Sequence, residues 1–166
     1  MTNLSYDAKM REAMQALTQW GAFLTTSADG AQNTMAIGWG SIGFAWGKPL
    51  FTVLVRNTRY THELLEKATE FVVSIPLTDH MQKELEYCGT QSGRDIDKFR
   101  TSNLKTAPGQ KVSVPIIAGC QLHYECRILT SLPISLDELH ESCHQWYADD
   151  YHILYVGEIL ACYEIA

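Results

Sequence analysis

Short runs of apolar residues along the chain predict strands. The stretch Pro49–Arg56 is almost continuously apolar and rich in β-branched residues, which predicts a buried strand. "EFVVSIP" at 70–76 predicts a second strand, which its final proline ends. "WGAFLTTS" at 20–27 predicts a third, and Ala28–Gly30 predicts the hairpin turn after it.

The second half of the chain predicts two more strands, at 116–128 and 151–165. Cys120 and Cys126 lie an even number of residues apart in the first of these, so we expect both to face the core on one side. Strands dominate, and short helices occupy the connections between them. This order favours a mainly β fold, a β-barrel or sandwich with peripheral helices, over a parallel α/β sheet.

Helical spacing of apolar residues interrupts this pattern in a few places. An amphipathic helix is predicted at Tyr6–Leu17, and another at 60–68, where apolar residues recur every four positions. "DHMQKELEYCG" at 79–89 ends in a glycine, as helices often do. "SGRDIDKFR" at 92–100 reads as a polar turn that enters a short helix. "SLDELHESCHQWY" at 135–147 predicts a further helix with a serine N-cap and a capping box.

Composition narrows the class of protein. The chain has 166 residues, 46% of them hydrophobic and 19% charged, which is typical of one globular domain spanning 1–166. The net charge of -6 argues against duplex nucleic acid as a partner, because phosphate neutralisation needs a basic face. No apolar run approaches the roughly 18 residues of a membrane span, and the N-terminal stretch does not resemble a signal peptide.

The cysteines indicate the compartment. There are five, an odd number, and no C-x-x-C pair occurs. Reduced thiols in a cytoplasmic protein are the simplest interpretation.

"VRNTRYTHELLEK", residues 55–67, gathers arginines and hydroxyls at the predicted start of a helix. Unpaired amide groups, hydroxyls from Thr58 or Thr61 and the guanidinium of Arg56 are what an anion such as phosphate binds. The alternative is that Thr61 only caps the helix and that both arginines of the stretch are solvated.

Two other glycine-bearing stretches are candidates for binding. In "CGTQSGRDIDKF", residues 88–99, Ser92 and Gly93 form a tight turn and Lys98 follows, an arrangement that suits phosphate unless it is only a surface turn. In "NTMAIGWG", residues 33–40, Trp39 between glycines suits the face of an aromatic ligand. The alternative for Trp39 is a core tryptophan beside a β-bulge.

"HESCH", residues 140–144, matches the H-E-x-x-H motif of zinc hydrolases. On an α-helix, His140 and His144 would share a face, with Glu141 as the base. The longer form of the motif fails, because Tyr147 and Asp150 stand where a glycine and a third histidine are required. A helical histidine pair without metal is the favoured interpretation, and zinc hydrolysis remains a remote alternative.

Four separated stretches together resemble one family. "NTMAIGWGSIGFAWGKP", "VLVRNTRYTHELLE", "CGTQSGRDIDKF" and "YHILYVGEI" occur in this order in the flavin reductase-like proteins, FMN-binding split-barrel proteins that include flavoredoxin. The resemblance extends from about Gly21 to Ala161. It implies a six-stranded antiparallel Greek-key split barrel that forms a homodimer and binds one FMN per subunit.

The resemblance also implies which residues contact FMN. Asn33, Thr34 and Met35 would meet the edge of the isoalloxazine, with Trp39 beside the ring. The residues expected around the phosphate are Arg56, Thr58, Tyr60, Thr61, Ser92, Gly93 and Lys98. No catalytic residue is assigned, and no metal is expected.

Two kinds of function follow from the resemblance. One is an NAD(P)H-dependent FMN oxidoreductase that passes electrons to flavin or another acceptor. The other is a non-enzymatic FMN electron carrier that exchanges electrons with a redox partner protein. His152 and Cys88 are candidates for the space above the ring, although His152 could instead be a strand residue bonded to a neighbouring loop. The preference between NADH and NADPH is left open.

Overall fold

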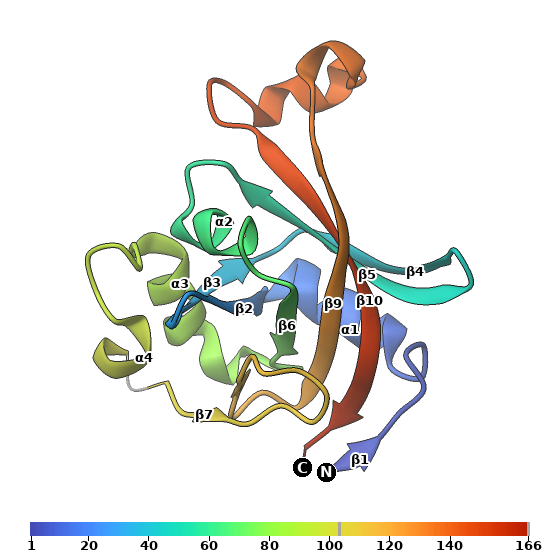
Figure 1. Cartoon of the computed structure of the whole chain (residues 1–166), viewed down its shortest axis with the longest axis vertical. Coiled ribbons are helices and arrows are strands. Elements are labelled where there is room, and N and C mark those ends of the chain that lie inside the picture. Colours follow the sequence, from blue (N-terminus) through green and yellow to red (C-terminus); the bar gives the residue numbers. More distant parts are fainter. Residues whose placement is uncertain (103, 166) are drawn as a thin grey trace.

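One long antiparallel sheet organises the chain (Figure 1). The structure is a computed structural model that describes residues 1–102 and 104–165, so Asn103 and Ala166 of the predicted single domain lie outside it. Its strands are arranged in the order β3-β2-β6-β9-β10-β5-β4, with β1 also paired to β10. Their bounds are β1 Thr2–Asn3, β2 Ala22–Ala28, β3 Ala31–Ile37, β4 Gly40–Ala45, β5 Lys48–Arg56, β6 Glu70–Ile75, β9 Leu122–Pro133 and β10 His152–Glu164. β7 (Thr106–Ala107) and β8 (Ile116–Ile117) form a separate pair.

The predicted mainly β, antiparallel class with peripheral helices is confirmed, but the described part of the main sheet has eight strands and not six. One addition is β4, which forms from the glycine-rich stretch before β5. A Cβ on Gly40 would lie 2.7 Å from the backbone oxygen of Thr52, so glycine permits this close pairing. The other addition is β1, whose Thr2 pairs with Glu164.

The predicted hairpin turn at Ala28–Gly30 is confirmed. Asp29 and Gly30, with φ of 52° and 78°, join β2 to β3. Positive φ at both central residues suits a tight hairpin, because the turn's twist then matches that of the strands.

The strand predicted at Pro49–Arg56 exists as β5, but only one of its faces is buried. Phe51, Val53 and Val55 are fully buried in the main core, whereas Leu54 is half-buried on the other face. Leu54 lines a cavity there, and this explains why an almost continuous apolar run is not a doubly buried strand.

The helices lie around the sheet. α1 spans Met10–Gln19, α2 Tyr60–Leu65, α3 Gln82–Thr90 after a short 3₁₀ turn η1 (Asp79–Met81), and α4 Lys98–Thr101. Four of the predicted helical regions are therefore confirmed, with shifted ends. α2 and α3 lie beside β2 and β3 at the left of Figure 1.

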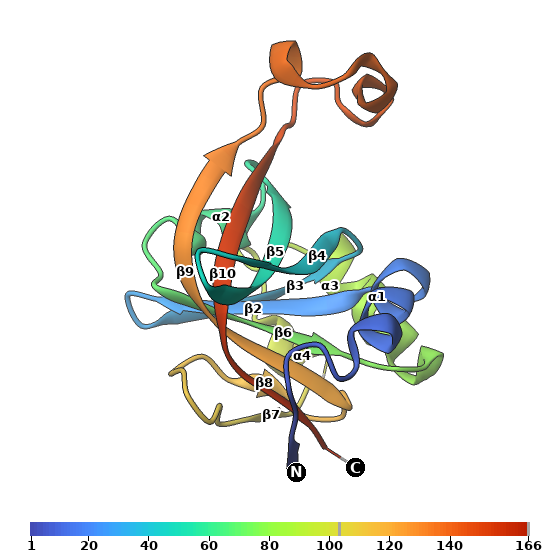
Figure 2. The same ribbon diagram turned by 90° about the vertical axis from the view of Figure 1, so that its right-hand side faces the viewer.

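The prediction of an α-helix at 135–147 is wrong. The segment forms two short 3₁₀ helices, η2 (Leu136–Glu138) and η3 (Glu141–Trp146), and Ser135 makes no side-chain cap. Neither 3₁₀ helix contains a buried residue, so no core packing supports a longer α-helix here. We call residues 134–151 the arm; it projects beyond the ends of β9 and β10 at the top of Figures 1 and 2.

The strand predicted at 116–128 is interrupted. β8 ends at Ile117 and β9 begins at Leu122, with a turn between them at Gly119, whose φ is 108°. Cys120 lies in this turn, and therefore it packs against Met81 in a secondary core while Cys126 packs in the main core. Both cysteines are buried as expected, but they do not share a face.

Candidate functional site

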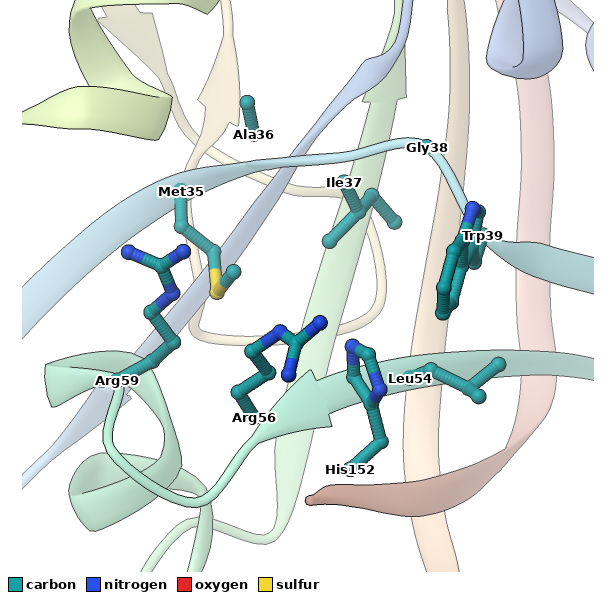
Figure 3. A pocket seen from close by; sticks show the side chains of 9 residues that line it. All are labelled: Met35, Ala36, Ile37, Gly38, Trp39, Leu54, Arg56, Arg59 and His152. Carbon is teal, nitrogen blue, oxygen red and sulfur yellow. The ribbon is translucent and has the colours of Figure 1, made fainter. Parts of the chain in front are cut away.

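Two neighbouring cavities lie where β3 and β5 approach α2 and the loop after α3. The larger has a volume of about 220 Å³ and the smaller about 110 Å³. Met35 and Arg59 line both, so the two cavities form one continuous groove. The larger cavity, shown in Figure 3, is lined by Met35, Ala36, Ile37, Gly38, Trp39, Leu54, Arg56, Arg59 and His152.

Ten of the eleven residues expected at the site line this groove. Met35, Trp39 and Arg56 line the larger cavity. The smaller cavity is lined by Asn33, Met35, Thr58, Tyr60, Thr61, Ser92, Gly93 and Lys98 among the expected residues. The exception is Thr34, whose buried hydroxyl accepts a hydrogen bond from Thr25 at 3.1 Å.

Strand geometry explains the exception. Successive side chains of β3 point to opposite faces, so Asn33, Met35 and Ile37 face the groove while Thr34 points away from it. The backbone of Thr34 still contributes, because its carbonyl oxygen accepts a hydrogen bond from Lys98 Nζ at 3.0 Å.

The smaller cavity has a rigid polar wall. The Asn33 side-chain amide is 3% exposed and donates to Thr61 Oγ1 at 2.8 Å. Thr61 is therefore an acceptor inside α2 and not its N-cap, which is Arg59. A Cβ on Gly93 would lie 2.8 Å from Tyr60 Cδ1 and closer still to the Asn33 side chain, so only glycine fits against this wall.

Lys98 lines the smaller cavity and is almost fully buried. It is 4% exposed, and its ammonium donates to the carbonyl oxygens of Thr34 and of Cys88, the latter at 2.8 Å. Burial lowers the pKa of Lys98, and the positive charge of Arg59 also acts to lower it. Two of the three ammonium donors are thus already engaged by protein oxygens.

Two of the arginines near the groove are also engaged. Arg56 donates to the backbone oxygens of Trp146, at 3.0 Å, and of Asp150, so it ties the end of β5 to the arm. It lines the larger cavity and is not among the residues of the smaller one, where the phosphate had been expected. Arg94 pairs with Glu63 and donates to the backbone oxygen of Thr58 at 3.1 Å.

Arg59 differs from these cations. Its side chain lines both cavities and rises from the loop before α2 toward Met35 in Figure 3. Within residues 1–102 and 104–165, its guanidinium makes no hydrogen bond or ion pair. Arg59 belongs to the 55–67 stretch in which a phosphate site is predicted, but neither Arg59 nor Leu54 is among the predicted site residues. Leu54 could have been found from its spacing, since it lies two residues before Arg56 on the same strand face.

An aromatic cluster closes the other end of the larger cavity. Trp39 lies with its ring 5.4 Å from that of Trp146 in the arm and 5.0 Å from that of His152. His152 Nδ1 is 3.0 Å from the Tyr147 hydroxyl, so His152 both lines the cavity and bonds a neighbouring loop. Burial, with help from Arg56, lowers the pKa of His152 to about 4, so its ring is neutral at neutral pH.

Cys88 lines the smaller cavity but is an unsuitable nucleophile. Its side chain is buried, and burial raises the pKa of its thiol to about 11. Because the thiolate is the reactive form, Cys88 is inert at neutral pH.

The H-E-x-x-H stretch does not form the α-helix that the zinc interpretation requires. His140 is the N-cap of η3, and positions four apart do not share a face of a 3₁₀ helix. His144 Nε2 donates toward the backbone oxygens of Leu136 and Leu139, at 3.2 and 2.9 Å. In the described part of the chain, no group of three metal-ligating side chains comes together. The described helices also include none that is both long and apolar enough to span a membrane.

Comparison with known proteins identifies the family. Residues 14–166 match the model of the flavin reductase like domain. An uncharacterised protein of Archaeoglobus fulgidus is 30% identical over 138 residues, which cover 83% of this chain and 68% of the relative. The crystal structure of a flavoredoxin from Methanosarcina acetivorans is 29% identical with a TM-score of 0.70, covering 87% of this chain and 68% of that one.

A second similar protein has been solved with small carbonyl compounds bound. The FMN-binding protein from Thermus thermophilus, solved with bound 1-cyclohex-2-enone and with p-hydroxybenzaldehyde, is 26% identical with a TM-score of 0.68. The match covers 87% of this chain and 69% of that one in the first of these structures. By the extent of the family match and the identity to these relatives, the chain belongs to the flavin reductase-like family of split-barrel proteins.

Proposed function

We propose that the groove binds FMN and that the chain is an FMN-dependent oxidoreductase that takes electrons from NADH or NADPH. One observation carries the proposal: ten residues from separate stretches of the sequence line two joined cavities. The larger combines apolar and aromatic side chains with cationic ones, and the smaller is polar. Such a groove suits a ligand with a flat ring at one end and an anionic group at the other.

The residues present fit FMN. The larger cavity offers Met35, Trp39 and Leu54 for the ring. The smaller offers hydroxyl, amide and guanidinium groups within about 110 Å³, enough for the end of the ribityl chain and one phosphate. The guanidinium of Arg59, which lines both cavities, supplies charge complementary to a phosphate anion.

The bound flavin would supply the redox chemistry, while the chain supplies binding, orientation and exclusion of water. Asn33, held by Thr61, keeps β3 and α2 in fixed relation along the groove. Arg56 lines the larger cavity and also bonds the arm through the backbone oxygens of Trp146 and Asp150. His152 is neutral and so places no positive charge beside the ring at neutral pH.

The second candidate is a non-enzymatic electron carrier. It is favoured by the flavoredoxin of Methanosarcina acetivorans, at 29% identity, and by the exposure of Trp39 (38%) and Trp146 (55%) at the end of the groove. Exposed aromatic side chains there suit the approach of a redox partner protein.

Anaerobic mixing of the FMN-loaded protein with NADH or NADPH separates the two. Rapid loss of the visible flavin absorption band supports the oxidoreductase. No loss with either nucleotide, but reduction by a reduced ferredoxin, supports the carrier. Failure of the protein to take up FMN refutes both.

We also propose a homodimer. Phe44 (64% exposed) and Trp46 (69%) on the β4–β5 hairpin, with Leu132 (52%) and Trp146 on or beside the arm, leave large apolar side chains in solvent. A second copy of the chain would cover such surface. Light scattering after size exclusion measures the mass directly.

A further inference from the structure

We infer that Lys98 is a positioning residue that joins the two walls of the smaller cavity, and that Arg59 is the cation that selects a phosphate-bearing flavin. This inference rests on the proposed function. It departs from the expectation that Lys98 and Arg56 meet the phosphate.

Lys98 connects three segments of the chain. Its ammonium donates to Thr34 on β3 and to Cys88 in the last turn of α3, while its own backbone begins α4. β3 is the edge strand of the described sheet, and the carbonyls in the last turn of a helix lack partners within that helix. Lys98 therefore satisfies two oxygens that their own elements leave open, and it links three segments.

Two of these segments carry the opposite walls of the smaller cavity. β3 carries Asn33 and Met35, which form one wall of the smaller cavity, and the loop after α3 carries Ser92 and Gly93, which form the other. The helix packs closely on the strand, since a Cβ on Gly89 would lie 3.4 Å from the Cβ of Ala36. Because its ammonium bonds both the strand and the helix, Lys98 helps to set the distance between the two walls.

Most of the cations that line the groove already bond protein oxygens. Arg56 is held by the arm, Arg94 by Glu63, and Lys98 by two carbonyl oxygens. Arg59 lines both cavities, and its guanidinium has no acceptor among the described residues. Among the described residues, an anion entering the groove therefore finds one guanidinium without an acceptor, that of Arg59.

The test uses FMN and riboflavin, which share the ring and differ in the phosphate. Dissociation constants for both are measured by flavin fluorescence with the full chain and with Arg59→Ala, Lys98→Met and the control Lys83→Met, an exposed lysine on α3. We expect Arg59→Ala to weaken FMN about tenfold to a hundredfold and to leave riboflavin unchanged. We expect Lys98→Met to weaken both ligands by the same factor and Lys83→Met to change neither.

Several results would overturn the inference. Selective loss of FMN in Lys98→Met would make Lys98 a phosphate ligand, and unchanged affinities in the folded variant would reduce it to a purely structural residue. Equal or absent effects of Arg59→Ala would remove the selecting role. If Lys98→Met does not fold, Lys98→Gln replaces it, because the amide keeps two N–H donors without the charge, and the same comparison applies.

The link can also be tested without a ligand. Hydrogen exchange in residues 89–94 of the flavin-free protein should accelerate in Lys98→Met and not in Lys83→Met. If the unmodified chain binds no flavin, the proposed function fails while this measurement still decides the role of Lys98; unchanged exchange would refute it.

Discussion

The substitution Gly93→Ala tests the packing of the groove most sharply. The added methyl group would meet Tyr60 Cδ1 at 2.8 Å and the Asn33 side chain at shorter range. Asn33 cannot turn aside freely, because it is buried and bonded to Thr61. Overpacking of this kind costs about 1–3 kcal/mol of folding free energy, with a further 1 kcal/mol or so if the hydrogen bond breaks.

A matched control exists on β4. A Cβ on Gly43 would find no atom within 4 Å, so Gly43→Ala should leave stability unchanged or slightly raise it. Thermal unfolding by circular dichroism measures both variants. At roughly 2–4 °C per kcal/mol for a chain of this length, we expect Gly93→Ala to melt about 2–16 °C lower than the unmodified protein.

The same variant should bind FMN more weakly, since the methyl group displaces the wall of the smaller cavity. Fluorescence titration below the melting transition measures this effect separately from stability. Equal melting temperatures and equal FMN affinities for Gly93→Ala and Gly43→Ala would refute the packing argument.

The remaining predictions concern pH, the arm and assembly. The pKa of His152 is lowered from 6.5 to about 4, so between these values the unfolded chain binds a proton that the folded chain does not. The free energy of unfolding should therefore fall as the pH drops from 6.5 to about 4. Urea titrations at several pH values measure this fall, which should be shallower in His152→Asn. Arg56→Ala should raise proteolytic cleavage within 134–151 more than Lys67→Ala does, because Arg56 bonds the arm whereas Lys67 pairs with Asp29; equal digestion rates would contradict it. Trp46→Arg should lower the mass seen by light scattering to that of one chain, and an unchanged dimer would exclude this hairpin from the interface.

Local patterns were sufficient to predict much of the fold. Apolar alternation and turn residues located the strands now seen as β2, β5, β6 and β10, and the hairpin at Asp29 and Gly30 followed from turn chemistry alone. The helix at 135–147 failed because its capping signals are local, whereas a helix also needs a buried face, and the arm offers none. Pairing of β1 with the distant β10 has no local signal in the sequence.

Most of the residues predicted to bind a ligand line one groove, but the arrangement of their side chains was not predictable. Glycine and hydroxyl motifs, together with the family resemblance, located the residues of the groove. They did not reveal that Lys98 and Arg56 bond backbone oxygens, because two of the acceptors, those of Thr34 and Trp146, lie 64 and 90 residues away in the sequence. Which of the described cations lacks a protein acceptor depends on contacts that form only in the folded chain.

The central claim is that one groove holds a flavin ring at Trp39 and its phosphate at the loop carrying Ser92 and Gly93. The most direct measurement is an FMN titration of the purified chain followed by flavin and tryptophan fluorescence. The account predicts saturation at one FMN per chain, with quenching of tryptophan emission and weaker binding in Arg59→Ala. No saturable uptake, or uptake unaffected by Arg59→Ala and Gly93→Ala, would contradict it.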